Sequence, residues 1–435
     1  MKKEEKDKVN LGVNMNNKIE EIRGKANRCL NCKVKPCSKG CPLENDIPSF
    51  IGEVKKQNYQ KAYEILTNTT FLPSICGRIC PHMSQCMGSC IRGIKHEPVE
   101  IGKLEAFIGD WAIKENYSVE IKKANGKKIA VIGGGPSGLT CSAFLAREGF
   151  EVTIFEKYQT LGGILSHGIP EFRLEREILE KQIQKILELG IKVEYGKELG
   201  KNLELKELEK NFDVIYLALG ANSSSKMKIE GENLEGVLGG NQLLENNLHP
   251  DYTNKKIAVI GGGNVAMDTA RTIKKLGAKK VEVIYRRARK QMPAETKEIE
   301  EAEKEGITFR FQTNIIKILG NQKVEKIECI QTQLVKKEGE LREVPVNVPN
   351  SNYLLDIDYV VMAVGSHTKP EMVKYLEKEQ IQFSQRGYIL VNENYQTTKQ
   401  NIFAGGDVIG SKATVAWAAR AGREAAKKII KYCGM

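Results

Sequence analysis

The sequence lacks the features of a membrane or exported protein. No apolar run approaches the roughly 18 residues that a membrane-spanning helix needs, and the charged segment from Met1 to Lys8 has no apolar core of a signal peptide. It also lacks a block of like charge, because the net charge of +12 comes from lysines mixed with glutamates. We therefore expect a cytoplasmic protein that has no membrane or nucleic-acid partner.

Length and composition indicate a globular protein of several domains. A chain of 435 residues has room for more than one core, and 41% hydrophobic with 28% charged residues excludes a disordered or fibrous chain. Residues 1 to about 20 predict a frayed leader. Apolar side chains recur at helical spacing over 101–114, and the polar stretch 122–126 marks the first domain boundary.

An internal repeat carries most of the information on the fold. The segment KKIAVIGGG at 127–135 returns letter for letter at 255–263, and each copy predicts a strand, a glycine turn and a helix. A shift this long suits two related nucleotide-binding domains and not a solenoid. The apolar runs 212–219 and 358–364 predict further buried parallel strands, whereas 319–352 predicts an antiparallel excursion.

The first glycine turn has the full context of a dinucleotide site. Its G-x-G-x-x-G motif, formed by Gly133, Gly135 and Gly138, opens the predicted helix 136–148, and Glu156 ends the next strand. The three glycines permit a tight turn, the approach of a pyrophosphate and close helix packing, in that order. The helix N-terminus favours phosphate, and Glu156 can accept from ribose hydroxyls. A glycine turn with no ligand is the alternative.

The second turn predicts a different nucleotide. After its motif, the strand 281–285 ends in Arg286 and Arg287 where the first site has an acid. An acid there repels a 2'-phosphate, whereas a guanidinium can bind it with two hydrogen bonds. We expect NADPH in preference to NADH, with Arg289 or Lys290 extending the same patch. A solvated basic strand end is the alternative.

Eight of the eleven cysteines form two sets near the N-terminus: Cys29, Cys32, Cys37 and Cys41, then Cys76, Cys80, Cys86 and Cys90. A reducing compartment disfavours disulfides. The spacing, and Pro42 after the first set, are typical of ferredoxins, so two 4Fe-4S clusters fit the count. Structural zinc is the alternative, although the gaps differ from those of paired C-x2-C knuckles. The other three cysteines are isolated, which argues against a redox disulfide beside a flavin.

Taken together, these motifs resemble the family of the glutamate synthase small (beta) subunit. Its relatives include the N-terminal half of dihydropyrimidine dehydrogenase and the large subunit of NADH-dependent ferredoxin:NADP oxidoreductase. The resemblance runs from Cys29 to Gly434 and includes LGGI at 161–164, GIPEFRL at 168–174, YRR at 285–287 and AVG at 363–365. It implies a helical iron–sulfur domain at 1–122, an FAD domain at 123–250 and 366–435, and an NADPH domain at 251–365. The expected fold is therefore α/β, with two Rossmann-like domains of the glutathione-reductase kind.

The resemblance also implies the cofactor contacts. Arg173 would touch the flavin and Asp407 would hold its ribityl chain, although locally Asp407 could be a helix cap. The expected FAD contacts are Gly133, Gly135, Pro136, Ser137, Gly138, Glu156, Lys157, Gly162, Gly163, Ile164, Arg173, Leu199, Gly406, Asp407, Thr414 and Val415. The expected NADPH contacts are Gly261, Gly263, Asn264, Val265, Ala266, Arg286, Arg287 and Gly365.

For the clusters, the resemblance implies one ligand set of Cys29, Cys32, Cys37 and Cys90, and a second of Cys41, Cys80, Cys86 and Glu105. Spacing alone favours Cys76 as the fourth ligand of the second set. A carboxylate is chemically reasonable there, because ligand type tunes cluster potential. The choice between Glu105 and Cys76 stays open.

The function that the resemblance implies is electron transfer from NADPH through FAD to the clusters, with no catalytic acid or base acting on a substrate. The first expectation is the electron-input subunit of a glutamate synthase, joined to a large catalytic subunit in a hetero-oligomer. The alternatives are the small subunit of a dihydropyrimidine dehydrogenase or an NAD(P)H:ferredoxin or sulfide oxidoreductase. A redox-inert scaffold is disfavoured by two intact nucleotide motifs.

Overall fold

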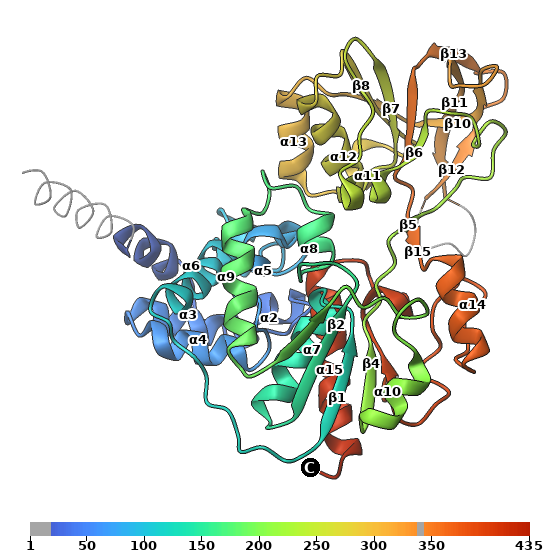
Figure 1. Ribbon diagram of the computed structural model, residues 1–435. Helices are drawn as coiled ribbons and strands as arrows, with labels where there is room; N and C mark the ends of the chain where they lie inside the picture. The colour runs from blue at the N-terminus through green and yellow to red at the C-terminus, as the bar shows by residue number, and fades with distance from the viewer. Residues whose placement is uncertain (1–18, 337–342) are drawn as a thin grey trace, which may run out of the picture. The chain divides into compact units, whose positions relative to one another are not determined.

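The computed structural model describes residues 19–336 and 343–435, which form two compact units (Figure 1). The first unit takes the chain up to Ser166, then Glu171–Gly220 and Glu371–Met435. The second comprises His167–Pro170 and Ala221–Pro370. Most of the expected leader lies outside the described residues, and residues 19–27 are helical.

The N-terminal part of the first unit is helical. Its elements are a helix over 19–27, α2 (Pro36–Gly40), α3 (Ile47–Lys55), α4 (Tyr59–Thr67), α5 (Pro73–Ile79), the 3-10 turns η1 (His82–Ser84) and η2 (Ile91–Ile94), and α6 (Ile101–Lys114). Helix α6 has the bounds predicted from its apolar spacing. Gly77 lets α5 approach α6 closely, because a Cβ on Gly77 would lie 2.4 Å from both the Ala106 nitrogen and the Gly102 oxygen.

A five-stranded parallel sheet forms the rest of the first unit. Its order is β16 (Ile402–Ala404), β4 (Val214–Leu217), β1 (Lys128–Ile132), β2 (Glu151–Glu156) and β3 (Lys192–Tyr195). All four residues of β4 are buried, as expected for a strand covered on both faces, which confirms the prediction over 212–219. The helices are α7 (Pro136–Arg147), α8 (Ile164–His167), α9 (Arg176–Leu187), α10 (Leu205–Asn211) and α15 (Val415–Tyr432), with the 3-10 turn η4 (Gly406–Ile409) before α15.

The second unit repeats this parallel arrangement. Its sheet has the order β6 (Val237–Gly239), β14 (Tyr359–Met362), β7 (Lys256–Ile260), β8 (Lys280–Tyr285) and β9 (Thr308–Phe311). Its helices are α11 (Gly240–Asn246), α12 (Asn264–Lys275) and α13 (Thr296–Lys304), with the 3-10 turn η3 (Arg289–Gln291). Strand β7 has the same sequence as β1, so the repeat is structural as well as local.

The predicted antiparallel excursion is present beside this sheet. It consists of β10 (Thr313–Leu319), β11 (Lys326–Val335), β12 (Val344–Asn347) and β13 (Tyr353–Asp356), all paired antiparallel. The short strands β5 (Ser223–Ser224) and β15 (Ser366–His367) pair with each other, and α14 (Pro370–Lys378) follows. Among the described residues, no helix has both the length and the apolar character needed to cross a bilayer.

The second unit starts earlier in the chain than the resemblance suggested. It begins at Ala221 and ends at Pro370, whereas the expected limits were 251 and 365. The difference arises because β6, which precedes residue 251, pairs with β14 in the second sheet. A strand of three residues carries too little periodicity to be recognised from sequence.

Candidate functional site

The first glycine turn, between β1 and α7, leaves one open backbone face. Gly133 has φ +103°, and a Cβ there would lie 2.5 Å from the Ala218 oxygen. A Cβ on Gly138 would lie 1.9 Å from the Gly133 oxygen, so packing excludes any side chain at this position. At Gly135, however, a Cβ would meet only the Cα of Gly163, at 3.8 Å. The chain therefore keeps Gly135 free of a side chain without a packing reason, as a pyrophosphate site requires.

Glu156 is tied to this turn from the end of β2. Its Oε2 accepts from the Gly134 amide at 2.8 Å and its Oε1 from the Tyr158 amide at 3.0 Å, and its side chain is buried. The Gly162 amide donates to the Gly134 oxygen at 2.8 Å, which brings 161–164 to the same place. Two segments named by the resemblance thus meet at the first turn.

A third segment, 406–415, reaches the turn from the C-terminal part of the chain. A Cβ on Gly406 would lie 2.9 Å from the Cβ of Ser137, the second residue of α7. Asp407 Oδ1 accepts from the Ser411 hydroxyl at 2.9 Å, and burial raises the pKa of Asp407. The cap of α15 is Thr414, whose hydroxyl accepts from the Trp417 amide. Asp407 is therefore not the cap of this helix.

Three other expected FAD contacts have different surroundings. Leu199 is buried in the core around β4 and forms a backbone bridge with Leu203. Lys157 places its ammonium group 4.4 Å from the centre of the Tyr158 ring. Arg173 is half-buried in the segment between α8 and α9. The roles of these three side chains stay predictions.

The second turn, between β7 and α12, has the same open face. A Cβ on Gly261, whose φ is +141°, would lie 2.2 Å from the Ala363 oxygen, whereas a Cβ on Gly263 would meet only the Pro293 ring, at 3.9 Å. Asn264 begins α12, and its Oδ1 accepts from the Glu295 amide at 3.0 Å. Ala266 is fully buried, in keeping with its place where the first motif has glycine. The residues of this turn fit a second dinucleotide.

Arg286 and Arg287 follow β8 and carry charge that no carboxylate neutralises within the described ranges. Arg286 is exposed, and its backbone oxygen accepts from the Thr332 hydroxyl at 2.8 Å. The Nε atom of Arg287 is buried without a hydrogen-bond partner among the described atoms. Arg289 differs from both, because it forms an ion pair with Glu303, with 2.8 Å between Nη2 and Oε2. Arg286 and Arg287 fit a phosphate, and Arg289 is already engaged.

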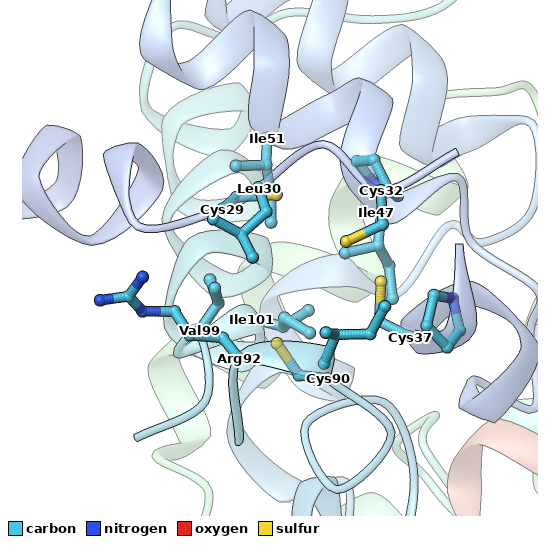
Figure 2. A pocket seen from close by; sticks show the side chains of 13 residues that line it. Cys29, Leu30, Cys32, Cys37, Ile47, Ile51, Cys90, Arg92, Val99 and Ile101 are labelled. Carbon is cyan, nitrogen blue, oxygen red and sulfur yellow. The ribbon is translucent and has the colours of Figure 1, made fainter. Parts of the chain in front are cut away.

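Four cysteines from two distant segments line one pocket (Figure 2). Cys29, Cys32 and Cys37 come from the chain before α3, and Cys90 comes from the start of η2; the sulfurs of the last three turn toward the space between them. Apart from the cysteines, apolar residues and Arg92 line the pocket. Burial raises the pKa of Cys37 to about 11. The structure thus brings together the four cysteines assigned to the first cluster.

In the remaining group, Cys41, Cys76, Cys86 and Glu105 are buried and Cys80 is partly buried. Burial raises the pKa of Glu105 to about 8, partly offset by a hydrogen bond from Asn45. Burial, followed by the charge of Glu105, raises the pKa of Cys41 to about 12. Both rivals for the fourth ligand, Cys76 and Glu105, are therefore present.

All eleven cysteines are free thiols, so the structure contains no disulfide. Within the described ranges, no three His, Cys, Asp or Glu side chains lie close enough together to share a single metal ion. The donors available in the two groups, eight cysteines and one buried carboxylate, fit iron–sulfur clusters by type.

Two side chains near the second group escaped the sequence analysis. Asn45 donates from Nδ2 to Glu105 Oε1 at 3.1 Å across a sequence separation of 60 residues. Arg423 of α15, only 1% exposed, donates to the backbone oxygens of Leu43 and Thr69. Neither residue belongs to a local motif, so only the Pro42 that follows Cys41 marks this loop as special in sequence.

Comparison with known proteins agrees with this geometry. The family described as pyridine nucleotide-disulphide oxidoreductase matches residues 127–425, and the domain described as dihydropyrimidine dehydrogenase domain II, 4Fe-4S cluster, matches residues 3–117. The small chain of NADPH glutamate synthase from Halomonas elongata is 33% identical over 95% of this chain and 91% of its own length. The beta subunit of NADP(+)-dependent formate dehydrogenase from Moorella thermoacetica is 34% identical over 91% of this chain and 60% of its own.

Among solved structures, Mycobacterium tuberculosis FprA in complex with NADPH superposes with a TM-score of 0.63 at 21% identity. The match covers 71% of this chain and 84% of FprA. The predicted fold class, two dinucleotide-binding domains after an iron–sulfur domain, is confirmed.

Proposed function

The chain belongs to the pyridine nucleotide-disulphide oxidoreductase family, with an added 4Fe-4S domain, and we propose that it is the electron-input small subunit of a glutamate synthase. It is an NADPH-dependent flavin and iron–sulfur oxidoreductase. Bound FAD supplies the conversion of a two-electron hydride transfer into single-electron steps. The protein itself binds and orients the cofactors and shields them from solvent, because no side chain need act as acid or base.

For the flavin nucleotide, the first turn supplies the phosphate site. The open face of Gly135 and the N-terminus of α7 would receive the pyrophosphate. Glu156 would accept from the ribose, since each of its oxygens holds one amide hydrogen bond and can accept another. Asp407, whose Oδ1 accepts from the Ser411 hydroxyl, would hold the ribityl chain.

For the nicotinamide nucleotide, the second turn and the end of β8 would bind different phosphate groups. Gly263 and the N-terminus of α12 would receive the pyrophosphate. Arg286, exposed and without an acidic partner in the described chain, would bind the 2'-phosphate together with Arg287. This arrangement gives a physical reason for NADPH in preference to NADH.

For the clusters, Cys29, Cys32, Cys37 and Cys90 would hold the first, and Cys41, Cys80, Cys86 and Glu105 the second. The observation that carries the proposal is the meeting of Cys90 with three cysteines of a distant segment in one pocket (Figure 2), within a chain that has two dinucleotide turns. A chain with these parts has an entry for hydride and an exit for single electrons.

A large catalytic subunit is the partner that we propose, since the relative from Halomonas elongata is named a small chain. A second candidate is a subunit of dihydropyrimidine dehydrogenase type, favoured by the match of residues 3–117 to a domain of that enzyme. Similarity to a formate dehydrogenase subunit shows that such a chain also serves other enzymes.

The test combines the purified anaerobic chain with a glutamate synthase large subunit. NADPH oxidation that requires both glutamine and 2-oxoglutarate would support the proposal. Reduction of the bound flavin by NADPH, with no turnover of NADPH that depends on glutamine and 2-oxoglutarate, would leave the electron-input role intact and favour the second candidate. A preparation without flavin, or without iron and acid-labile sulfide, would contradict the proposal altogether.

A further inference from the structure

The second group contains five candidate ligands, one more than the four that a 4Fe-4S cluster binds. Cys76 and Glu105 lie on the two helices that cross at Gly77, since Cys76 precedes Gly77 on α5 and Glu105 precedes Ala106 on α6. A Cβ on Gly77 would lie 2.4 Å from the Ala106 nitrogen, so the two backbones touch at this point. The backbone positions of Cys76 and Glu105 therefore do not decide which of the two side chains is the ligand. The orientation of each side chain has to decide it.

Asn45 fixes the orientation of only one of the two. It is 1% exposed, and it donates from Nδ2 to Glu105 Oε1 at 3.1 Å. Its Oδ1 accepts from the Thr69 hydroxyl at 2.6 Å. The same hydroxyl also lies 3.1 Å from the Leu66 oxygen, and when its proton is on the Asn45 side the NH2 end of the amide faces the Glu105 carboxylate, which accepts from it.

The supports of Asn45 are themselves buried and anchored. Leu43, two residues before Asn45, and Thr69, whose hydroxyl donates to the Asn45 amide oxygen, both offer backbone oxygens to Arg423. Arg423 is 1% exposed and lies on α15. The loop from Cys41 to Asn45 is thus attached to a long helix of the same unit, so a shift of Asn45 would break several buried hydrogen bonds.

We propose that Asn45 is a positioning residue that holds the carboxylate of Glu105, the expected fourth ligand of the second iron–sulfur site, in the orientation that binds iron. The inference rests on the proposed iron–sulfur function. With Oε1 held by Asn45, Oε2 is the oxygen left for iron. Outer contacts of this kind orient metal ligands and tune the site.

The test uses the full-length anaerobic holoprotein, with iron and sulfide analysis and a redox titration followed by electron paramagnetic resonance. Cys76→Ser should leave the iron content and both cluster signals unchanged. Asn45→Ala should release Glu105 and let the Cys76 thiol bind. At one solution potential, the reduced-to-oxidised ratio of one cluster should then change about tenfold, which is about 59 mV for one electron. Adding Cys76→Ser to Asn45→Ala should remove about half of the iron.

Asn58→Ala is the matched control, since Asn58 caps α4 in the same helical part and touches neither ligand. If Asn45→Ala does not fold, Thr69→Val removes the support of the amide at nearly constant volume, and a shift of the same cluster is expected. Loss of a cluster in Cys76→Ser alone would overturn the proposal. Unchanged cluster potentials in Asn45→Ala would also overturn it, and Thr69→Val takes the place of Asn45→Ala if the latter does not fold. Absence of iron and sulfide from the unaltered protein would instead contradict the proposed function.

Discussion

Gly163 lies against Gly135 so closely that a Cβ built on Gly163 would be 2.9 Å from the Gly135 Cα. The two backbones pass with no side chain between them, although α7 and β2 separate the two segments in the chain. In the reverse direction the contact is loose, since a Cβ on Gly135 would be 3.8 Å from the Gly163 Cα. A methyl group on Gly135 therefore has room in the protein, and any harm that it does must come from a ligand.

This asymmetry predicts that Gly135→Ala folds normally and loses flavin. Alanine readily adopts the φ of −79° found at this position. The free energy of unfolding of the flavin-free variant should therefore lie within about 0.5 kcal/mol of that of the parent. The methyl group would occupy the pyrophosphate approach, and the dissociation constant for FAD should rise at least about tenfold, or about 1.4 kcal/mol. Thermal unfolding and flavin content measure the two effects.

Gly138→Ala is the matched control for that experiment. Its methyl group would lie 1.9 Å from the Gly133 oxygen, so the fold itself should lose about 1–3 kcal/mol. Full flavin occupancy in Gly135→Ala would remove this turn as the pyrophosphate site.

The nucleotide preference should depend on Arg286 and not on Arg289. A charge-assisted hydrogen bond contributes about 1.5–3 kcal/mol, so Arg286→Ala should raise the KM for NADPH by about 10- to 100-fold while that for NADH stays the same. Arg289→Ala should change neither constant much, because Arg289 is paired with Glu303. Steady-state reduction of an artificial acceptor by each nucleotide measures both constants. Equal effects of the two substitutions would mean that the patch acts only by its overall charge.

Local patterns predicted the elements of this fold well. The helix 101–114 was predicted with its observed bounds because its apolar residues repeat with the helical period. The two glycine turns were recognised because strand, turn and helix follow one another within a few residues. The limit of the second unit was not, because the strand Val237–Gly239 is short and pairs with residues more than a hundred positions later.

The candidate site, like the fold, has features that local sequence patterns predict and features that depend on contacts between distant segments. Cysteine spacing indicates clusters, but spacing cannot show that Cys90 joins Cys37, because that contact depends on how η2 folds back. The pairing came from a family resemblance, and the pocket agrees with it. The bond from Asn45 to Glu105 had no signal at all, since a buried asparagine and a glutamate 60 residues apart match no motif.

Asp407 predicts a pH effect on stability with a defined sign. Burial raises its pKa in the folded protein above that in the unfolded chain, so folding favours the protonated form. The contribution is favourable below the unfolded pKa, about 3.9, and is lost as the pH rises through the folded pKa. Flavin-free Asp407→Asn should therefore be more stable than the parent by about 1 kcal/mol at neutral pH, and the difference should vanish near the unfolded pKa. Its affinity for FAD should fall.

Urea unfolding of both flavin-free proteins across this pH range measures the difference. Asp251→Asn serves as a control of opposite sign, because a hydrogen bond with Thr253 lowers the pKa of that exposed carboxyl. It should lose stability relative to the parent at neutral pH. A gain of stability in both variants would point to overall charge and not to burial of Asp407.

Arg423 should be among the least replaceable side chains of the first unit. It is 1% exposed, and its guanidinium donates to the carbonyl oxygens of Leu43 and Thr69 while Glu424 accepts from its Nε at 2.7 Å. Arg423→Met fills much of the same volume but leaves two buried carbonyls without a donor, at about 1–3 kcal/mol each. We expect a loss of about 2–5 kcal/mol in urea unfolding, with faster amide hydrogen exchange in the loop that carries Cys41.

Lys427→Met should change stability by less than about 0.5 kcal/mol, since Lys427 is 54% exposed and pairs with the same glutamate at the surface. Equal stability of the two variants would mean that water replaces the guanidinium, and that the loop does not depend on α15 for its position.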